Sequence, residues 1–253
     1  MDLSQLFASY TAFIAGKLAV LDSLALALIQ ALAVVAVIVA AAQEKFKANP
    51  DPGAMILRLV LRIGFTLLLF RNYQGLVMEP FYHGMLEEVA FQLGDLDVLE
   101  RFWDLVLKMA GFSLGFSIFG NIGSIANPIL IVTTLAGFLA YGLVIAIISA
   151  MILTAGFYLA VGKLMLCTLI FTKTEALFMA WFRALLGAMF GLAAFWFFMA
   201  ALGEFSLLDQ LLGQLTDISS VGQIPLAVIH FAVVIATSLL LTLQARRIGR
   251  EMV

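Results

Sequence analysis

Residues 109–162 form an uninterrupted run of 54 residues without a single Asp, Glu, Lys or Arg. A helix needs about 20 apolar residues to cross the hydrocarbon core of a bilayer. The run is therefore too long for one crossing, and three crossings would leave almost nothing for turns. Because it opens on the glycine-rich stretch 111–128, the first question is whether that stretch crosses a membrane, forms a loop or lines a passage.

The composition of the whole chain indicates an integral membrane protein. Of its 253 residues, 64% are hydrophobic and 12% are charged, whereas soluble domains carry roughly 25% charged residues. The formal net charge of −2 gives no basic character that would favour bulk nucleic-acid binding. The single cysteine excludes a disulfide within the chain, and the start of the chain lacks the basic region of a signal peptide, so we expect residue 1 to belong to the mature protein.

Apolar segments separated by polar loops predict the architecture. We expect a single membrane domain over 1–253 with an outer segment at 79–140, in which apolar residues at helical spacing predict an amphipathic helix over 96–108. The sequence thus predicts an all-α integral membrane protein with about five transmembrane helices, an apolar re-entrant or oligomer-buried hairpin and an amphipathic outer helix. The predicted spans are 20–42, 57–78, 141–171, 184–203 and 223–243.

The distribution of Lys and Arg predicts the topology, because short loops rich in these residues stay cytoplasmic. Segments 43–62 and 172–183 and the C-terminal tail carry the basic residues, so we place them inside and the N-terminus outside. Arg58 and Arg62 lie four residues apart near the start of the second span, where long side chains can snorkel to a headgroup layer. An odd number of crossings must then separate residues 108 and 172. One crossing is the simpler solution, with 109–140 entering the membrane region and returning, or shielded by other subunits; three crossings would require 111–128 to span.

Several residues inside the apolar segments are candidates for function. Lys163 is the only basic residue between 109 and 172, and it lies either near a water-filled passage or beside an acid on a neighbouring helix. His230 is a candidate proton relay, since ionisable groups within membranes are often functional, or it makes an interhelical hydrogen bond. A set of small, polar and aromatic residues forms a candidate pore constriction or oligomer axis, with plain close packing as the alternative: Gly111, Gly115, Phe119, Asn121, Gly123 and Asn127.

No motif of an enzyme is present. The sequence contains no HExxH, no CxxC and no GxxxxGK[ST], and its two histidines lie in different segments. We therefore expect a protein without catalytic residues, bound cofactor or metal, which takes any energy it needs from a partner or a gradient.

Two stretches carry a resemblance to a known family. The segment LRLVLRIGFTLLLFRNYQGLV at 57–77 resembles the second span of the TrbL/VirB polytopic family, the sixth VirB component of type IV secretion systems. The stretch LCTLIFTKTEALFMAWFRALLGAMFGLAAF at 166–195 is similar to the family's most recognisable region, and Phe178, Trp181 and Arg183 match its pattern. The family is described with an outside N-terminus, five spans, an outer loop between spans two and three, and a cytoplasmic C-terminus.

The resemblance implies a non-enzymatic channel or scaffold subunit in a bacterial inner membrane, with the N-terminus periplasmic. Such subunits form an oligomeric base, described as five-fold symmetric, for a periplasmic stalk or pilus and lie on the path of transported DNA or protein. The implied partners are lipid, copies of the same chain, a minor pilin that would face 79–108, and other secretion subunits including ATPases. The alternative is a small-solute or proton-coupled transporter that uses Lys163 and His230, although we find none of the inverted repeats common in transporters.

Overall fold

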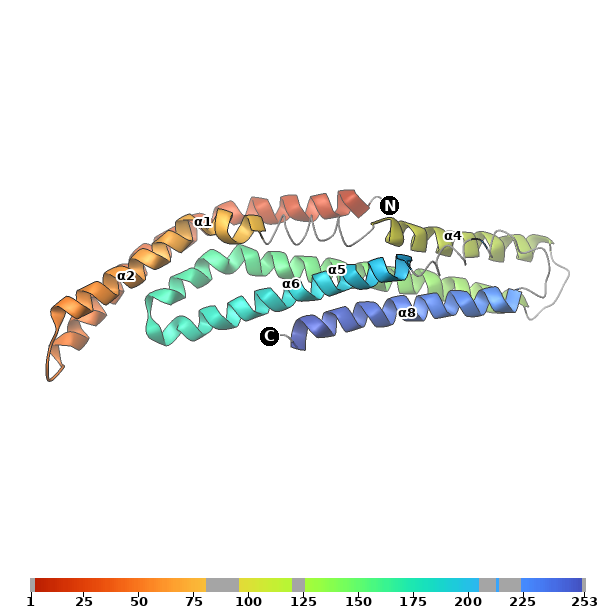
Figure 1. The fold of residues 1–253 in the computed structure, drawn as a ribbon. Coiled ribbons are helices and arrows are strands. Elements are labelled where there is room, and N and C mark those ends of the chain that lie inside the picture. Colours follow the sequence, from red (N-terminus) through yellow and green to blue (C-terminus); the bar gives the residue numbers. More distant parts are fainter. Residues whose placement is uncertain (1–2, 81–95, 120–125, 205–212, 214–223, 252–253) are drawn as a thin grey trace. The chain divides into compact units, whose positions relative to one another are not determined.

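The computed structural model describes residues 3–80, 96–119, 126–204, 213 and 224–251. Within these ranges every regular element is helical, in the order α1, α2, η1, α4, α5, η3 (Cys167–Ile170), η4 (Thr172–Thr174), α6 and α8 (Figure 1). The chain divides into two compact units, one comprising Met1–Gly84, Leu153–Met189 and Met252–Val253, and the other Met85–Ile152 and Phe190–Glu251. The all-α architecture predicted from the composition is confirmed.

Five of the described helices are long and apolar enough to cross a membrane. Large apolar side chains cover their surfaces without being buried, as for Val34 and Ile38 of α1, which are 61% and 62% exposed. Apolar surface of this kind is stable against lipid and costly in water. The protein is therefore a multi-pass membrane protein. The five candidate spans are Leu21–Lys45, Pro52–Arg71, Pro128–Ile170, Thr172–Gly203 and Leu226–Glu251.

The helices differ in their bounds from the apolar windows that predicted them. They comprise α1 (Leu3–Lys45), α2 (Pro52–Arg71), α5 (Ala126–Leu166), α6 (Glu175–Glu204) and α8 (Ile224–Glu251). The second span was predicted to start at 57, but Pro52 already occupies the first turn of α2, where its missing N–H needs no partner. Asp51 caps this helix, since its Oδ1 accepts a hydrogen bond from the Ala54 N–H at 3.0 Å. The predicted end at 78 falls in η1, a π-helical turn over Gln74–Met78.

The outer segment differs most from the prediction. The predicted amphipathic helix does not end at 108 but continues as α4 (Leu96–Phe119), and α5 begins at Ala126 rather than at 141. Phe102 of α4 lies 5.7 Å from Tyr141 of α5 between ring centroids, and Val106 lies at Gly137, so the two helices pack antiparallel. Residues 111–119 and 126–128 therefore belong to two different helices, and 111–128 is not one spanning helix.

The amphipathic pattern of α4 is borne out by its burial. Val98, Phe102, Val106 and Met109 are buried, and this stripe joins a core that includes Phe231 of α8. Glu100, Asp104 and Lys108 lie on the exposed side of the same helix. The apolar face of α4 is therefore buried against residues of α5 and α8 rather than exposed to lipid.

Candidate functional site

Lys163 of α5 forms an ion pair with Asp22 of α1. The Nζ atom lies 2.6 Å from Oδ2 of Asp22, with the two side chains 15% and 42% exposed respectively. The ammonium also lies 5.4 Å from the ring centroid of Phe70, within the range of a cation–π contact. Of the two expectations for Lys163, pairing with an acid on a neighbouring helix is the arrangement found.

Close packing surrounds this pair where α5 meets η1 and α6. The buried Tyr73 donates a hydrogen bond from Oη to the Leu159 carbonyl oxygen at 2.8 Å. A Cβ at Gly162 would overlap the Tyr73 hydroxyl and would lie 2.7 Å from Cζ2 of Trp181. Glycine at 162 is thus what allows both aromatic side chains to reach the α5 backbone.

The residues of the family pattern have different surroundings. Trp181 is buried and donates a hydrogen bond from Nε1 to the Tyr158 carbonyl oxygen at 2.8 Å. Phe178 packs beside it with ring centroids 5.3 Å apart. Arg183 is exposed. Trp181 therefore joins the start of α6 to α5, with Phe178 packed against it on the same helix, whereas Arg183 is accessible to a ligand, a lipid or another subunit.

Arg62 of α2 binds the junction between α5 and α6. Its Nε donates to the Leu169 carbonyl oxygen at 2.7 Å, its Nη1 to Thr172 Oγ1 at 2.7 Å, and its Nη2 to Glu175 Oε2 at 2.8 Å. The planar guanidinium suits three such acceptors, because its donors are held in a fixed fork. Arg62 was expected to snorkel toward headgroups, but its guanidinium is hydrogen-bonded to residues of this junction instead.

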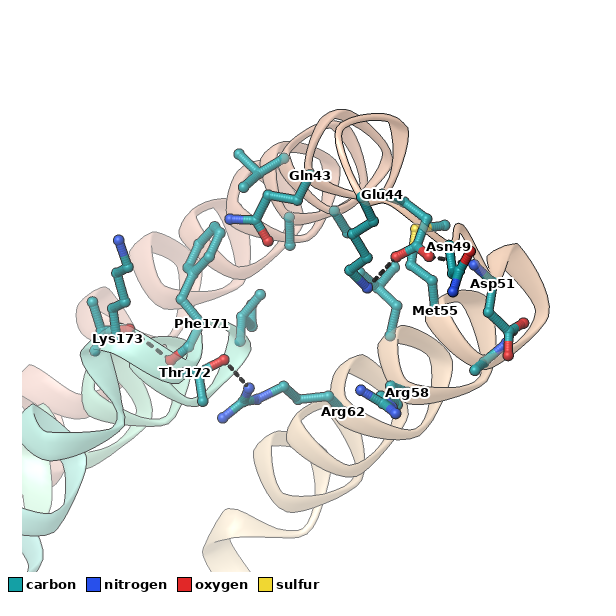
Figure 2. Close-up of a pocket in the computed structure, with 18 residues that line it drawn as sticks. Gln43, Glu44, Asn49, Asp51, Met55, Arg58, Arg62, Phe171, Thr172 and Lys173 are labelled. Atoms are coloured by element: carbon teal, nitrogen blue, oxygen red, sulfur yellow. Dashed lines mark hydrogen bonds and ion pairs between the residues drawn. The ribbon is translucent and has the colours of Figure 1, made fainter.

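A cavity of about 810 Å³ lies beside this junction, as Figure 2 shows. Phe171 and Thr172 border it on one side, and the α1–α2 turn with Glu44 and Asp51 borders it on the other. The apolar part of its wall comes from α1 (Ala36, Val39 and Ala40), from α2 (Ala54, Met55 and Leu59) and from Ile170 and Phe171. The charged lining residues are Glu44, Lys47, Asp51, Arg58, Arg62 and Lys173.

The two acids of this lining already have partners within the chain. Glu44 accepts hydrogen bonds from Lys47 Nζ at 2.5 Å and from the Asp51 N–H at 2.6 Å, and Asp51 caps α2. The side chains of Arg58 and Lys173, in contrast, make no hydrogen bond or ion pair with any residue that the structure describes. Two cations without a partner among the described residues therefore border the cavity, Arg58 on α2 and Lys173 at the α5–α6 junction (Figure 2).

The residues predicted to form a pore segment are only partly described. Gly111 lies on the exposed side of α4, and a Cβ there would meet no atom within 4 Å. Gly115 and Phe119 fall in the last turns of α4 and Asn127 in the first turn of α5, whereas Asn121 and Gly123 lie outside the described residues. The pore or axis role of this segment stays a prediction.

His230 is half-buried in α8 and belongs to the other compact unit from Lys163. Its role as a proton relay or as an interhelical hydrogen-bonding residue stays a prediction. Among the described parts of the chain, no group of three or more His, Cys, Asp or Glu side chains is placed to hold a metal ion.

Sequence reasoning missed Asp22, Tyr73 and the cavity. Asp22 could have been found, since it is the only acid inside the first apolar segment and Lys163 the only base in its own. Tyr73 gave no such indication, because an aromatic residue at the end of a span is usually an interface anchor.

Neither a scan of protein-family models nor a search of curated proteins finds a match for this chain. The resemblance to the TrbL/VirB family therefore rests on the residues of 57–77 and 166–195.

Proposed function

We propose that this protein is a non-enzymatic inner-membrane subunit of a type IV secretion machine, resembling the sixth VirB component. The observation that carries the proposal is the stretch 166–195, in which a span ends, a short polar loop follows, and the pattern with Phe178, Trp181 and Arg183 opens the next span. Its support is that Trp181 of this pattern bonds α6 to α5 and that Phe178 packs against Trp181, so the pattern includes a residue that holds two spans together.

In this role the chain assembles with its own copies into a base for a periplasmic stalk or pilus and contributes to the DNA or protein translocation path. The acids exposed on α4, Glu100 and Asp104, give the outer segment a surface that suits a basic partner such as a minor pilin. The exposed apolar faces of α1 and α2 are available for lipid or for neighbouring copies.

The decisive experiment is deletion of this chain in its host, followed by complementation. We expect loss of substrate transfer and of pilus assembly, both restored by the wild-type chain. A pull-down in mild detergent should then recover a minor pilin and a secretion ATPase. Unchanged transfer and unchanged pili in the deletion strain would refute the proposal.

The inside C-terminus and periplasmic N-terminus are tested separately by reporter fusions. Fusions after residues 90 and 215 should report the periplasm, and fusions after 48, 176 and 250 should report the cytoplasm, because the basic loops stay inside. A cytoplasmic signal at residue 90 would refute the topology inferred from the distribution of Lys and Arg, and it would not test the secretion role.

The ion pair between Lys163 and Asp22 favours a second candidate, a small-solute or proton-coupled transporter. Intramembrane pairs of this kind mark ion and proton pathways in many transporters. In proteoliposomes, a solute flux that is lost on Lys163→Gln and kept on Lys45→Gln would support this candidate. Absence of flux for the wild-type chain would leave the pair with a structural role.

A further inference from the structure

The hairpin of α1 and α2 extends well past the junction between α5 and α6. Arg62 is level with this junction, because it bonds Leu169, Thr172 and Glu175, and α2 begins ten residues earlier at Pro52. At a rise of 1.5 Å per residue, the hairpin tip lies about 15 Å beyond the junction. Figure 1 shows the same offset between the orange α1–α2 turn and the green-blue α5–α6 turn.

This offset leaves a notch that the described residues of the chain do not fill. The cavity of about 810 Å³ occupies it, with Ala36, Val39 and Leu59 on its apolar side and the cations Arg58 and Lys173 on its lining. Cavities of roughly 300–1,000 Å³ are typical of ligand sites. In a membrane, an apolar wall beside a cationic one matches a molecule with an anionic head and a hydrocarbon tail.

We propose that the notch binds the phosphate headgroup of an anionic phospholipid, with Arg58 and Lys173, which lie on opposite borders of the notch, as the cations that attract it. Both cations lack a partner among the described residues, while Lys47 pairs with Glu44 and the Asp51 carboxylate accepts the N-terminal Ala54 N–H of α2. The lining carries four cations, Lys47, Arg58, Arg62 and Lys173, and two acids, so it is positive overall. Basic pockets between transmembrane helices recognise anionic headgroups. The acyl chains lie against the apolar residues that α1 and α2 present to the notch. The proposal depends on membrane insertion and not on the secretion role.

The inference is tested on the full-length protein purified in detergent, with bound lipid counted by native mass spectrometry. Phosphatidylglycerol and phosphatidylcholine are titrated separately, and inorganic phosphate is added as a competitor. We expect preferential retention of phosphatidylglycerol and a loss of about fivefold in its affinity per cation removed, hence about 25-fold for Arg58→Gln with Lys173→Gln. Lys45→Gln is the matched control, because Lys45 is an exposed base at the end of α1 that does not line the cavity.

Charge-conserving variants separate recognition from folding. Arg58→Lys combined with Lys173→Arg should retain the preference for phosphatidylglycerol, whereas the paired Gln variants lose it. Equal retention of both lipids by the wild-type chain, or an unchanged preference in the paired Gln variants, would overturn the proposal. Displacement of phosphatidylglycerol by equimolar inorganic phosphate would identify a soluble-phosphate site instead and would equally overturn the lipid assignment.

Discussion

The ion pair between Lys163 and Asp22 makes an asymmetric prediction about stability. The Lys163 side chain is 15% exposed and that of Asp22 is 42% exposed, so the ammonium is the more enclosed partner. Removing one member of a fully buried pair costs roughly 3–5 kcal/mol, and an exposed pair contributes at most about 1 kcal/mol. Asp22→Asn leaves the enclosed ammonium without its counter-charge, and we expect it to cost about 2–3 kcal/mol. Lys163→Gln leaves the half-exposed carboxylate and should cost about 1 kcal/mol.

A double-mutant cycle measures the coupling directly. The free energy of unfolding of the purified full-length chain is measured by titrating dodecylmaltoside micelles with sodium dodecyl sulfate and following far-UV circular dichroism. The double variant should cost less than the two single variants together, by about 1–2 kcal/mol. The control Lys45→Gln should lie within about 0.5 kcal/mol of the wild type, because Lys45 is exposed at the end of α1.

The reasoning would be refuted by either of two results. If Lys163→Gln cost more than Asp22→Asn, the enclosed ammonium would not be the group that needs compensation. If the costs of the single variants added up, the two side chains would not be coupled, and the 2.6 Å contact between them would contribute nothing measurable to folding.

The same unfolding assay tests two further features. Gly162→Ala should destabilise the protein by about 1–3 kcal/mol through overpacking against Tyr73 and Trp181. Gly142→Ala, whose Cβ would meet no atom within 4 Å, should be neutral or stabilising by up to about 1 kcal/mol; equal effects of the two variants would contradict the close approach at Gly162. Tyr73→Phe should cost about 1 kcal/mol, because the phenol loses its hydrogen bond to the Leu159 carbonyl oxygen, and an unchanged stability would show that this bond is exchanged for another at no cost.

The sequence predicted that the outer segment contains an amphipathic helix, but it did not predict where this helix ends. The recurrence of apolar residues through Phe102 and Val106 correctly identified a one-sided helix. The predicted end of this helix at 108 was wrong. After Lys108 the helix carries no charged residues, so the alternation of apolar and charged faces that marks an amphipathic helix is lost, although the helix itself continues to Phe119. Burial of Met109 and Ser113 in the continuing helix depends on what packs against it, which composition alone does not reveal.

The candidate site was predictable only as isolated residues. Lys163 was recognised as an unusual base in an apolar segment, but its two expected surroundings could not be separated until Asp22 was found 2.6 Å away. Arg62 and Thr172 are joined across 110 positions of sequence. Such contacts depend on the rotation and the sliding of one helix against another, and helices that are apolar all round do not encode either quantity in their pattern.

The sequence by itself determined the helical class and the long apolar segments from which the five candidate spans among the described residues are built. A chain in lipid must satisfy its backbone hydrogen bonds internally, and about 20 apolar residues are needed for each crossing, so long apolar segments leave few alternatives to helices. Only the tertiary structure decided that α1 and α2 extend past the α5–α6 junction and leave a notch lined by Arg58 and Lys173. The physical reason is that the bilayer fixes the length and composition of each helix, while side-chain contacts such as those of Arg62 and Tyr73 fix how far each helix slides along its neighbour.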